Sequence, residues 1–231
     1  LVVATFGAFM IPFDSSAVNV AIPSIGEELG GELAFLTWVP LASLLSMTSL
    51  VLIFGRLADL KGRRLLYTTG VTIFTMAAIV CTLSRSIFQL ISARAIQGLG
   101  ASMISGNSIA FVTATFPPHE RGRALGINTT AVYLGASMGP TLGGFLIGNF
   151  GWRSIFYVNI PLGVVIVLLL FLKVGEPIKT KSEGSLDLLG AATLACAISS
   201  TVAAGTFSRS TILPPSSIWL LAIVGVLAMV G

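Results

Sequence analysis

The ten residues GRLADLKGRR, numbered 55–64, carry four of the chain's 13 basic residues and separate two long apolar runs. These runs cover residues 35–55 and 65–84, and each is long enough to cross a bilayer as a helix, which takes about 20 apolar residues. A short basic break between two such runs is typical of a cytoplasmic loop between membrane-spanning helices. The stretch therefore predicts a helical membrane protein.

The rest of the chain has the composition of a membrane protein. Of its 231 residues 55% are hydrophobic and 10% are charged, whereas soluble domains carry about 25% charged residues. The apolar runs are continuous rather than alternating, which indicates helices, because a helix satisfies its own backbone hydrogen bonds in lipid. We expect an all-α polytopic protein with eight membrane-spanning helices, the last incomplete, at residues 2–23, 35–55, 65–84, 87–113, 123–148, 154–173, 187–207 and 217–231.

The basic residues predict how these helices are oriented, because cytoplasmic loops carry an excess of lysine and arginine. The breaks after the second, fourth and sixth runs hold nine of the 13 basic residues, the other breaks hold three, and Arg94 lies inside the fourth run. We therefore expect the breaks after even-numbered runs to face the cytoplasm. The net charge of +4 does not indicate a nucleic-acid partner, because no basic face interleaved with aromatic residues accompanies it.

Residues 135–139, GASMG, satisfy the G-x-S-x-G pattern of a serine-hydrolase nucleophile elbow. Such an elbow needs a strand-to-helix turn with histidine and acidic partners. No strand is expected before Ser137, and His119, the sole histidine, is predicted in a break at the other end of the helix. Cys81 and Cys196 lie within apolar runs and are expected to be buried free thiols. We expect no enzyme activity, no metal site and no cofactor.

Three glycines explain this stretch better than a nucleophile does. Gly135, Gly139 and Gly143 recur every four residues and so lie on one face of the fifth predicted helix. Small residues on one face let a neighbouring helix approach closely. Pro140 lacks an N–H group, leaves the carbonyl of Ala136 unpaired and is expected to bend the helix. The stretch predicts a closely packed, kinked helix.

The opening stretch has a counterpart in GFLIGNFGWR, residues 144–153. Both stretches contain G-x-L-x-x-x-x-G-x-R, at an offset of 89 residues. The first copy joins two runs on the inner side and the second joins two runs on the outer side, so the copies have opposite orientations. This relationship is expected of three-helix inverted repeats within a six-helix half of a transporter. The outer copy has lost most of the charges of the inner one.

Five stretches, in chain order, resemble motifs of the major facilitator superfamily, and in particular of its drug:proton antiporters of the EmrB/QacA type, which have fourteen helices. The stretch GRLADLKGRR is similar to that family's loop between its second and third helices, and LISARAIQGLGAS, residues 90–102, resembles its fourth-helix motif. The others resemble motifs of the first, fifth and sixth helices and are FDSSAVNVAIPSI (13–25), GASMGPTLGG (135–144) and GWRSIFYVNIPLG (151–163).

The resemblance implies a domain organisation. Residues 1–173 would form the N-terminal six-helix transporter bundle, residues 174–186 a cytoplasmic linker, and residues 187–231 two additional membrane helices. Both ends of the chain lie within apolar runs, so we expect a fragment whose C-terminal six-helix half is missing. The implied partners are a small-molecule solute, protons and the lipid bilayer, and the implied location is the plasma membrane.

Asp14 and Arg94 are charged residues within predicted spans and are candidates for proton coupling. At a rise of about 1.5 Å per residue, both fall about 10 Å below the outer face of a core about 30 Å thick, on different helices. An unpaired charge at that depth is costly, so we expect the two residues to pair. Arginine stays charged, which makes Asp14 the expected proton carrier. The alternative is a pair that only fixes helix packing.

The resemblance implies further functional residues. Within residues 55–64, Asp59 and Arg63 would latch helix ends together while the cytoplasmic side is closed; the alternative is a plain basic anchor. Gln97 and Asn19 would line the substrate cavity or form hydrogen bonds there. The complete groups are Gly55, Asp59, Gly62, Arg63 and Arg64 for the gating loop, and Gly135, Gly139, Pro140, Gly143 and Gly144 for the antiporter motif of the fifth helix.

We therefore predict part of a secondary active transporter that exchanges protons for an organic solute by alternating access, with multidrug efflux as its role. Two alternatives stay open. One is a carrier of a sugar, a siderophore or another metabolite, and the other is a non-transporting membrane sensor on the same fold.

Overall fold

The computed structural model describes residues 1–173 and Thr193. Residues 1–173 form six helices and no strand, with bounds α1 Val2–Leu29, α2 Leu33–Lys61, α3 Arg63–Leu83, α4 Ile87–Thr115, α5 Pro118–Phe150 and α6 Ser154–Lys173. All six are long and apolar enough to cross a bilayer. The predicted all-α architecture is confirmed for this part of the chain, and the predicted helices at 187–207 and 217–231 lie outside the described residues.

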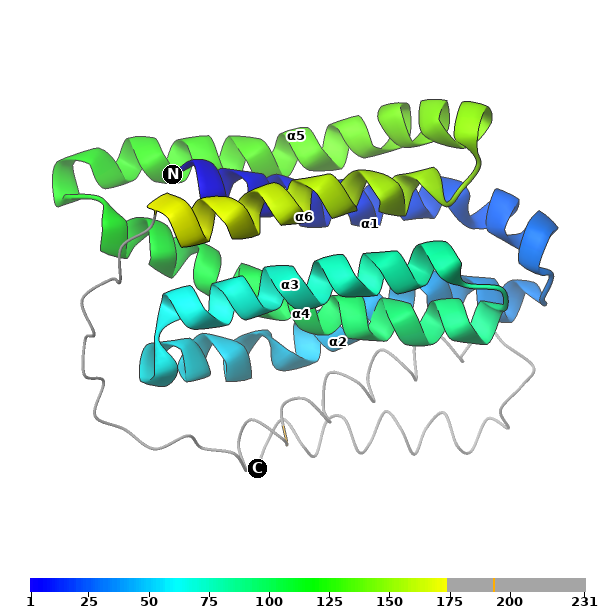
Figure 1. The fold of residues 1–231 in the computed structure, drawn as a ribbon, viewed down its shortest axis with the longest axis horizontal. Helices are drawn as coiled ribbons and strands as arrows, with labels where there is room; N and C mark the ends of the chain where they lie inside the picture. Colours follow the sequence, from blue (N-terminus) through cyan, green and yellow to red (C-terminus); the bar gives the residue numbers. More distant parts are fainter. Residues whose placement is uncertain (174–192, 194–231) are drawn as a thin grey trace.

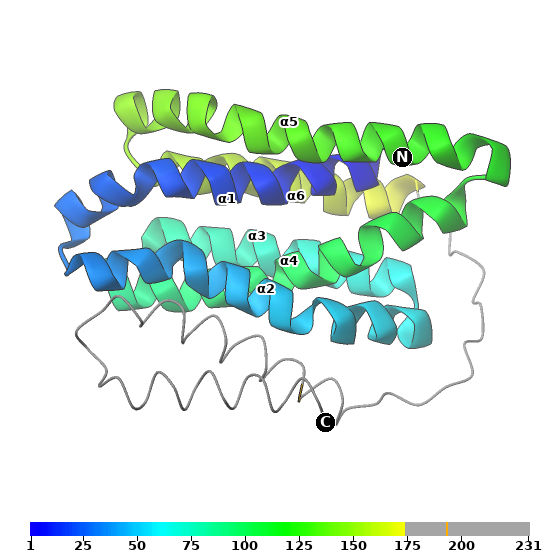
Figure 2. The same ribbon diagram turned by 180° about the vertical axis from the view of Figure 1, so that it is seen from behind.

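Successive helices run in opposite directions (Figures 1 and 2). The α2–α3 and α4–α5 junctions and the end of α6 lie at one end of the bundle, on the left of Figure 1. The α1–α2, α3–α4 and α5–α6 junctions lie at the other end. The breaks that are rich in basic residues therefore lie at one end of the bundle, and the assignment of this end to the cytoplasm stays a prediction.

The junction between α2 and α3 is shorter than the sequence indicated. Helix α2 continues to Lys61 and α3 begins at Arg63, so the basic stretch is helical apart from Gly62. Gly62 has a φ angle of 106°, a conformation that costs glycine little, and its N–H donates to the carbonyl of Ala58 at 2.9 Å. Hydropathy marks where apolar side chains stop, whereas backbone hydrogen bonding lets a helix extend further.

Gly151 ends α5 in the same way, with a φ angle of 77° and an N–H that donates to the carbonyl of Ile147 at 3.0 Å. It is the counterpart of Gly62 at the offset of 89 residues, since 62 + 89 = 151. The packing shows this symmetry in part. Helix α1 packs extensively on α5 and α2 packs extensively on α4, and these pairs are equivalent if α1–α3 repeat as α4–α6. Helix α3 departs from the symmetry, because it packs on α4 far more extensively than its equivalent α6 packs on α1.

The glycine face of α5 packs against α1. Gly135, Gly139 and Gly143 are all buried there. A Cβ atom added at Gly143 would lie 2.9 Å from the Cβ of Ala17, and one added at Gly139 would lie 2.9 Å from the Cβ of Ser16. The close approach expected from the glycine spacing is therefore made to α1.

The remaining residues of that stretch have different surroundings. Gly144, next in sequence to the glycine face, has open space where a Cβ would lie. The hydroxyl of Ser137 is exposed and donates to the carbonyl of Tyr133 at 2.8 Å, one turn back in α5. Helix α5 continues without interruption past Pro140, so Ser137 occupies no strand-to-helix turn. The stretch is a helix surface, as the glycine pattern indicated, and the bend at Pro140 stays a prediction.

Two large apolar clusters fill the bundle. One includes Met10, Tyr67, Phe74, Ile104, Phe111 and Ile166, and the other includes Ala17, Ile25, Cys81, Leu90, Trp152 and Phe156. Between the two clusters, α1, α4 and α6 each bury polar side chains. They form the candidate site.

Candidate functional site: a buried ion pair between two apolar clusters

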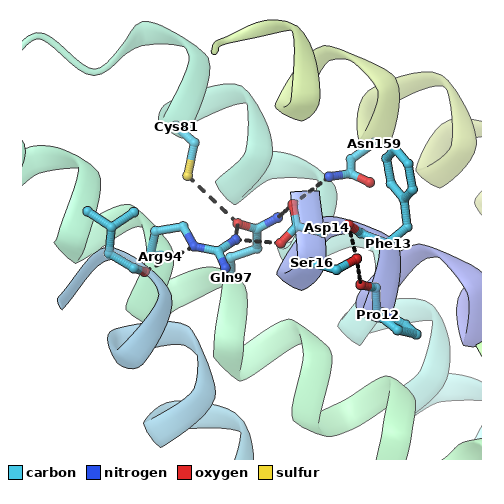
Figure 3. Close-up of polar contacts among 9 residues, drawn as sticks. Pro12, Phe13, Asp14, Ser16, Cys81, Arg94, Gln97 and Asn159 are labelled. Atoms are coloured by element: carbon cyan, nitrogen blue, oxygen red, sulfur yellow. Dashed lines mark hydrogen bonds and ion pairs between the residues drawn. The ribbon is translucent and has the colours of Figure 1, made fainter. Parts of the chain in front are cut away.

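Four polar side chains from three helices meet in the middle of the bundle (Figure 3). Asp14 comes from α1, Arg94 and Gln97 from α4, and Asn159 from α6. Their exposed fractions are 1%, 1%, 0% and 0%, so the group is sealed from solvent in this conformation. Buried polar groups of this kind are stable only when they satisfy one another.

Asp14 accepts three hydrogen bonds. Its Oδ2 accepts from Nη1 of Arg94 at 2.5 Å, and its Oδ1 accepts from Nδ2 of Asn159 at 2.6 Å and from Nε2 of Gln97 at 3.2 Å. All three partners donate, which is the arrangement that suits an ionised carboxylate. Asp14 lies on the face of α1 that also buries Met10, Ala17 and other core residues, so helical periodicity carries it into the bundle.

Arg94 connects this group to one further helix, α2, and makes a second contact with α6. Its Nη1 also donates to Oε1 of Gln97 at 2.6 Å, and its Nε donates to the carbonyl of Val39 on α2 at 3.3 Å. Its guanidinium carbon lies 5.8 Å from the ring centre of Phe156 on α6. Arg94 and Gln97 are three residues apart and so share one face of α4. The guanidinium thus contacts α1, α2, α4 and α6 together.

The structure brings together Asp14, Arg94 and Gln97, as their positions in the sequence indicated, but not Asn19. Asn19 is exposed on α1 and is no part of the buried group. The second amide that donates to Asp14, besides Gln97, is that of Asn159, which the sequence did not lead us to expect. One signal was present: Asn159 is the sole side-chain amide in the apolar run of α6.

Neither Cys81 nor His119 belongs to the buried polar group through a charged contact. Cys81 is buried and free, and its Sγ lies 3.8 Å from Oε1 of Gln97. His119 is exposed, with Nε2 at 3.8 Å from Oε1 of Glu120. Cys196 lies outside the described residues. Within residues 1–173 and Thr193, no three metal-binding side chains of the His, Cys, Asp and Glu types come together.

At the basic end of the bundle, Arg63 holds Asp59 and the end of α4. Its Nε and Nη2 donate to Oδ1 of Asp59 at 3.1 and 3.0 Å, and its Nη1 donates to the carbonyl of Ala110 at 2.9 Å. Both side chains of the pair are about one-third exposed. Arg64 donates from Nη2 to the carbonyl of Leu170 on α6 at 2.8 Å. The stretch 55–64 therefore links α2 and α3 to α4 and α6.

The same region contains a close helix crossing. A Cβ atom added at Gly55 would lie 3.6 Å from the carbonyl oxygen of Gly106, and one added at Gly106 would lie 2.7 Å from the carbonyl oxygen of Val51. Gly55 thus lies where α2 and α4 approach each other.

The opposite end of the bundle has a cluster that the sequence reasoning did not anticipate. Arg153 donates from Nε to the carbonyl of Thr82 at 3.0 Å and from Nη2 to that of Ser84 at 2.9 Å, and it pairs with Glu28. Its guanidinium lies 4.3 Å from the ring centre of Trp152, whose Nε1 donates to Glu28 at 2.7 Å. Arg153 is the counterpart of Arg64, since 64 + 89 = 153. The outer copy of the pattern therefore retains one charged residue, Arg153, which forms an ion pair and hydrogen bonds.

Six membrane-length helices that enclose a buried ion pair define a polytopic helical membrane protein. Residues 4–231 match the sequence family described as the Major Facilitator Superfamily. The chain belongs to this superfamily and is an integral, multi-pass membrane protein. This membership also bears out the expectation that the chain is not an enzyme.

Among curated relatives, the riboflavin transporter RibZ of Clostridioides difficile (strain 630) is 36% identical over 190 residues, which are 82% of this chain and 42% of the relative. The multidrug resistance protein Stp of Mycobacterium tuberculosis (strain ATCC 25618 / H37Rv) is 42% identical over 191 residues, which are 82% of this chain and 35% of the relative. The chain thus spans less than half the length of these relatives.

A solved structure has the same fold. The inward open conformation of the xylose transporter XylE from E. coli matches with a TM-score of 0.68 and 16% identity, over 100% of this chain and 56% of that chain. At this identity the likeness concerns the fold alone. The fold is the N-terminal half of a major facilitator protein.

Proposed function

We propose that this chain is the N-terminal part of a secondary active transporter that exchanges protons for an organic solute by alternating access. The observation that carries the proposal is the buried pair of Asp14 and Arg94, because a charge pair that only stabilised the bundle could be replaced by apolar residues at little cost. Ionisable residues within membrane spans mark ion and proton pathways by default.

The coupling step that we propose uses Asp14 as the proton carrier. When ionised, Asp14 is held by Arg94 on α4 and by the amides of Gln97 and Asn159. A proton on the carboxyl group cancels its charge and weakens its attraction to Arg94, which stays charged. The preference of α1 for α4 therefore differs between the two protonation states, and such a difference is what a ligand needs in order to shift a conformational equilibrium.

The stretch 55–64 serves as a cytoplasmic gate in this proposal. Asp59 holds the guanidinium of Arg63 in position to bind the carbonyl of Ala110 on α4, and Arg64 binds that of Leu170 on α6. These contacts latch the inner ends of four helices and must rearrange if the ends move apart. A plain basic anchor would need the positive charges but not Asp59.

The proposed solute is a drug-like organic compound, and the proposed role is multidrug efflux at the plasma membrane. Support comes from the motifs shared with antiporters of the fourteen-helix EmrB/QacA type and from relatives named a multidrug resistance protein and a drug efflux pump. The proposal includes a cytoplasmic linker at 174–186 and two further membrane helices at 187–231, a part of the chain that the family match also covers. A C-terminal six-helix bundle completes the transporter in this proposal.

A second candidate function is a carrier of a metabolite. The relative named a riboflavin transporter, at 36% identity, favours it. Exposed polar residues on α1, such as Asn19, would contribute to the solute cavity in either case.

Transport by inside-out membrane vesicles tests the proposal. The vesicles contain the complete transporter, meaning the full-length protein that includes this chain, and the probes are ethidium and riboflavin in parallel. An imposed pH gradient should drive accumulation of one probe, and a protonophore should abolish it. Accumulation that is indifferent to the gradient would refute proton exchange, and the probe that accumulates decides between efflux of a drug-like cation and carriage of the metabolite.

A further inference from the structure

In the side-chain amide of Asn159, the nitrogen forms a short hydrogen bond and the oxygen forms none. Its Nδ2 donates to Oδ1 of Asp14 at 2.6 Å, whereas its own Oδ1 is buried and lacks a hydrogen-bond partner. Among the side chains that the structure describes, no other buried nitrogen or oxygen atom is left unpaired. An unpaired buried acceptor carries a free-energy cost and so calls for an explanation.

We propose that Asn159 is a positioning residue that senses the protonation state of Asp14 by rotating its side-chain amide, and so transmits that state from α1 to α6. The inference rests on the proposed function, in which Asp14 gains and loses a proton. With Asp14 ionised, the amide must present its NH₂ group, because its oxygen would repel the carboxylate. The orientation in the structure is the one that suits the ionised form.

Protonation of Asp14 leaves one acceptor for the new O–H group. Oδ2 faces the guanidinium of Arg94, so the proton resides on Oδ1, which faces Asn159 and Gln97. The oxygen of Gln97 already accepts from Nη1 of Arg94 at 2.6 Å, and rotating that amide would turn its NH₂ group toward the cation. The free oxygen of Asn159 has no such commitment and becomes the acceptor once the amide rotates.

The exchange is balanced. One proton is added to Oδ1 of Asp14, the N–H···O bond from Asn159 is replaced by an O–H···O bond to Asn159, and no other covalent bond changes. One amide atom of Asn159 is unpaired in either orientation. The protonation state of Asp14 therefore decides which orientation is favoured.

The other groups around the carboxyl group do not compete for this role. The titratable side chains that face Asp14 within the described residues are Arg94 on α4 and, through Gln97, Cys81 on α3. Helix α2 contributes the backbone carbonyl of Val39, and no titratable side chain of α5 bonds to the cluster. Asn159 is the link from Asp14 to α6.

Infrared difference spectra recorded across a pH titration test the inference on the complete transporter, purified and reconstituted in liposomes. The carboxyl C=O band of Asp14 is assigned by its loss in Asp14→Asn, and the amide C=O band of Asn159 by its loss in Asn159→Ser. We expect both bands to titrate with the same midpoint. An amide band of Asn159 that does not change while the Asp14 band titrates would overturn the inference.

The variant Asn159→Leu supplies a second measurement, because leucine has a similar volume and no polar atom. The carboxyl band of Asp14 should move to higher frequency, since its O–H group has lost its acceptor. The control Asn149→Leu, at an exposed asparagine of α5, should leave the band in place. An unchanged band in Asn159→Leu would also overturn the inference. Absence of any band that depends on Asp14 would instead refute the proposed proton carrier, so the two failures are distinguishable.

Discussion

Nη1 of Arg94 lies 2.5 Å from Oδ2 of Asp14, although 80 residues separate them in the chain and the two side chains are 1% and 2% exposed. The pair joins α4 to α1 in a layer that separates the two apolar clusters of the bundle. A contact of this kind changes strength with one proton, and it involves helices from both three-helix repeats. In the proposed mechanism, protonation of Asp14 would therefore alter the relation between the repeats.

Asp14→Asn should uncouple the complete transporter. Asparagine fills the same space and retains an oxygen for Arg94, but it cannot bind and release a proton. We expect solute binding to persist and pH-driven accumulation in inside-out vesicles to be lost. Full accumulation by this variant would show that the proton travels elsewhere.

Arg94→Lys should shift the pH optimum of transport. Lysine keeps the positive charge, but it lacks the planar fork that contacts Asp14, Gln97 and the carbonyl of Val39 together. The variant therefore alters the contacts that hold the carboxyl group of Asp14, and we expect the pH optimum of transport to move. The measurement is the initial rate of accumulation against pH, and an unchanged profile would exclude Arg94 as the residue that tunes Asp14.

Asp59→Asn should strongly slow transport without affecting membrane insertion. The variant removes the carboxylate that orients Arg63 toward the carbonyl of Ala110 and leaves every basic residue of the stretch in place. Glu120→Gln is the matched control, since Glu120 is an exposed acid at the same end of the bundle. Wild-type rates for Asp59→Asn, at equal amounts of inserted protein, would reduce the stretch to a topological signal.

Arg153→Ala should lower the melting temperature of the purified transporter by several degrees. The variant loses hydrogen bonds to the carbonyls of Thr82 and Ser84 and the pairing with Glu28, and we expect a loss of about 1 kcal/mol because the ion pair is partly exposed. Arg85→Ala, at an exposed arginine on the same side, is the control and should have little effect. Equal melting temperatures for the two variants would show that the contacts of Arg153 with Glu28, Thr82 and Ser84 do not stabilise the protein.

Gly143→Ala should destabilise the bundle more than Gly144→Ala, although the two positions are adjacent. The methyl group at position 143 would lie 2.9 Å from the Cβ of Ala17 on α1, whereas position 144 has open space. The expected cost at Gly143 is about 1–3 kcal/mol, as for other insertions into close-packed contacts. Thermal unfolding of the two variants measures the difference, and the reverse order would contradict the packing of α5 on α1.

Several features of this protein could be read from its sequence, because they depend on the chain's own periodicity. The length of the apolar runs predicted six helices in the described part, and the structure confirms them. The rise of a helix put Asp14 and Arg94 at one depth, and the spacing of Gly135, Gly139 and Gly143 marked a packing face. The pattern repeated at 89 residues anticipated the equivalent positions of Gly62 and Gly151.

Other features depended on which helices meet, and only the tertiary structure decided them. Asn159 is the sole side-chain amide of its run, but nothing in the run identified Asp14 as its partner. Asn19 lies outside the buried group because helical rotation places it on the exposed side of α1. Glu28 and Arg153 lie 125 residues apart and meet because α1 and α6 bring their outer ends together. Periodicity sets the depth and the face of a residue along its own helix, whereas the neighbour on that face is set by how the helices pack.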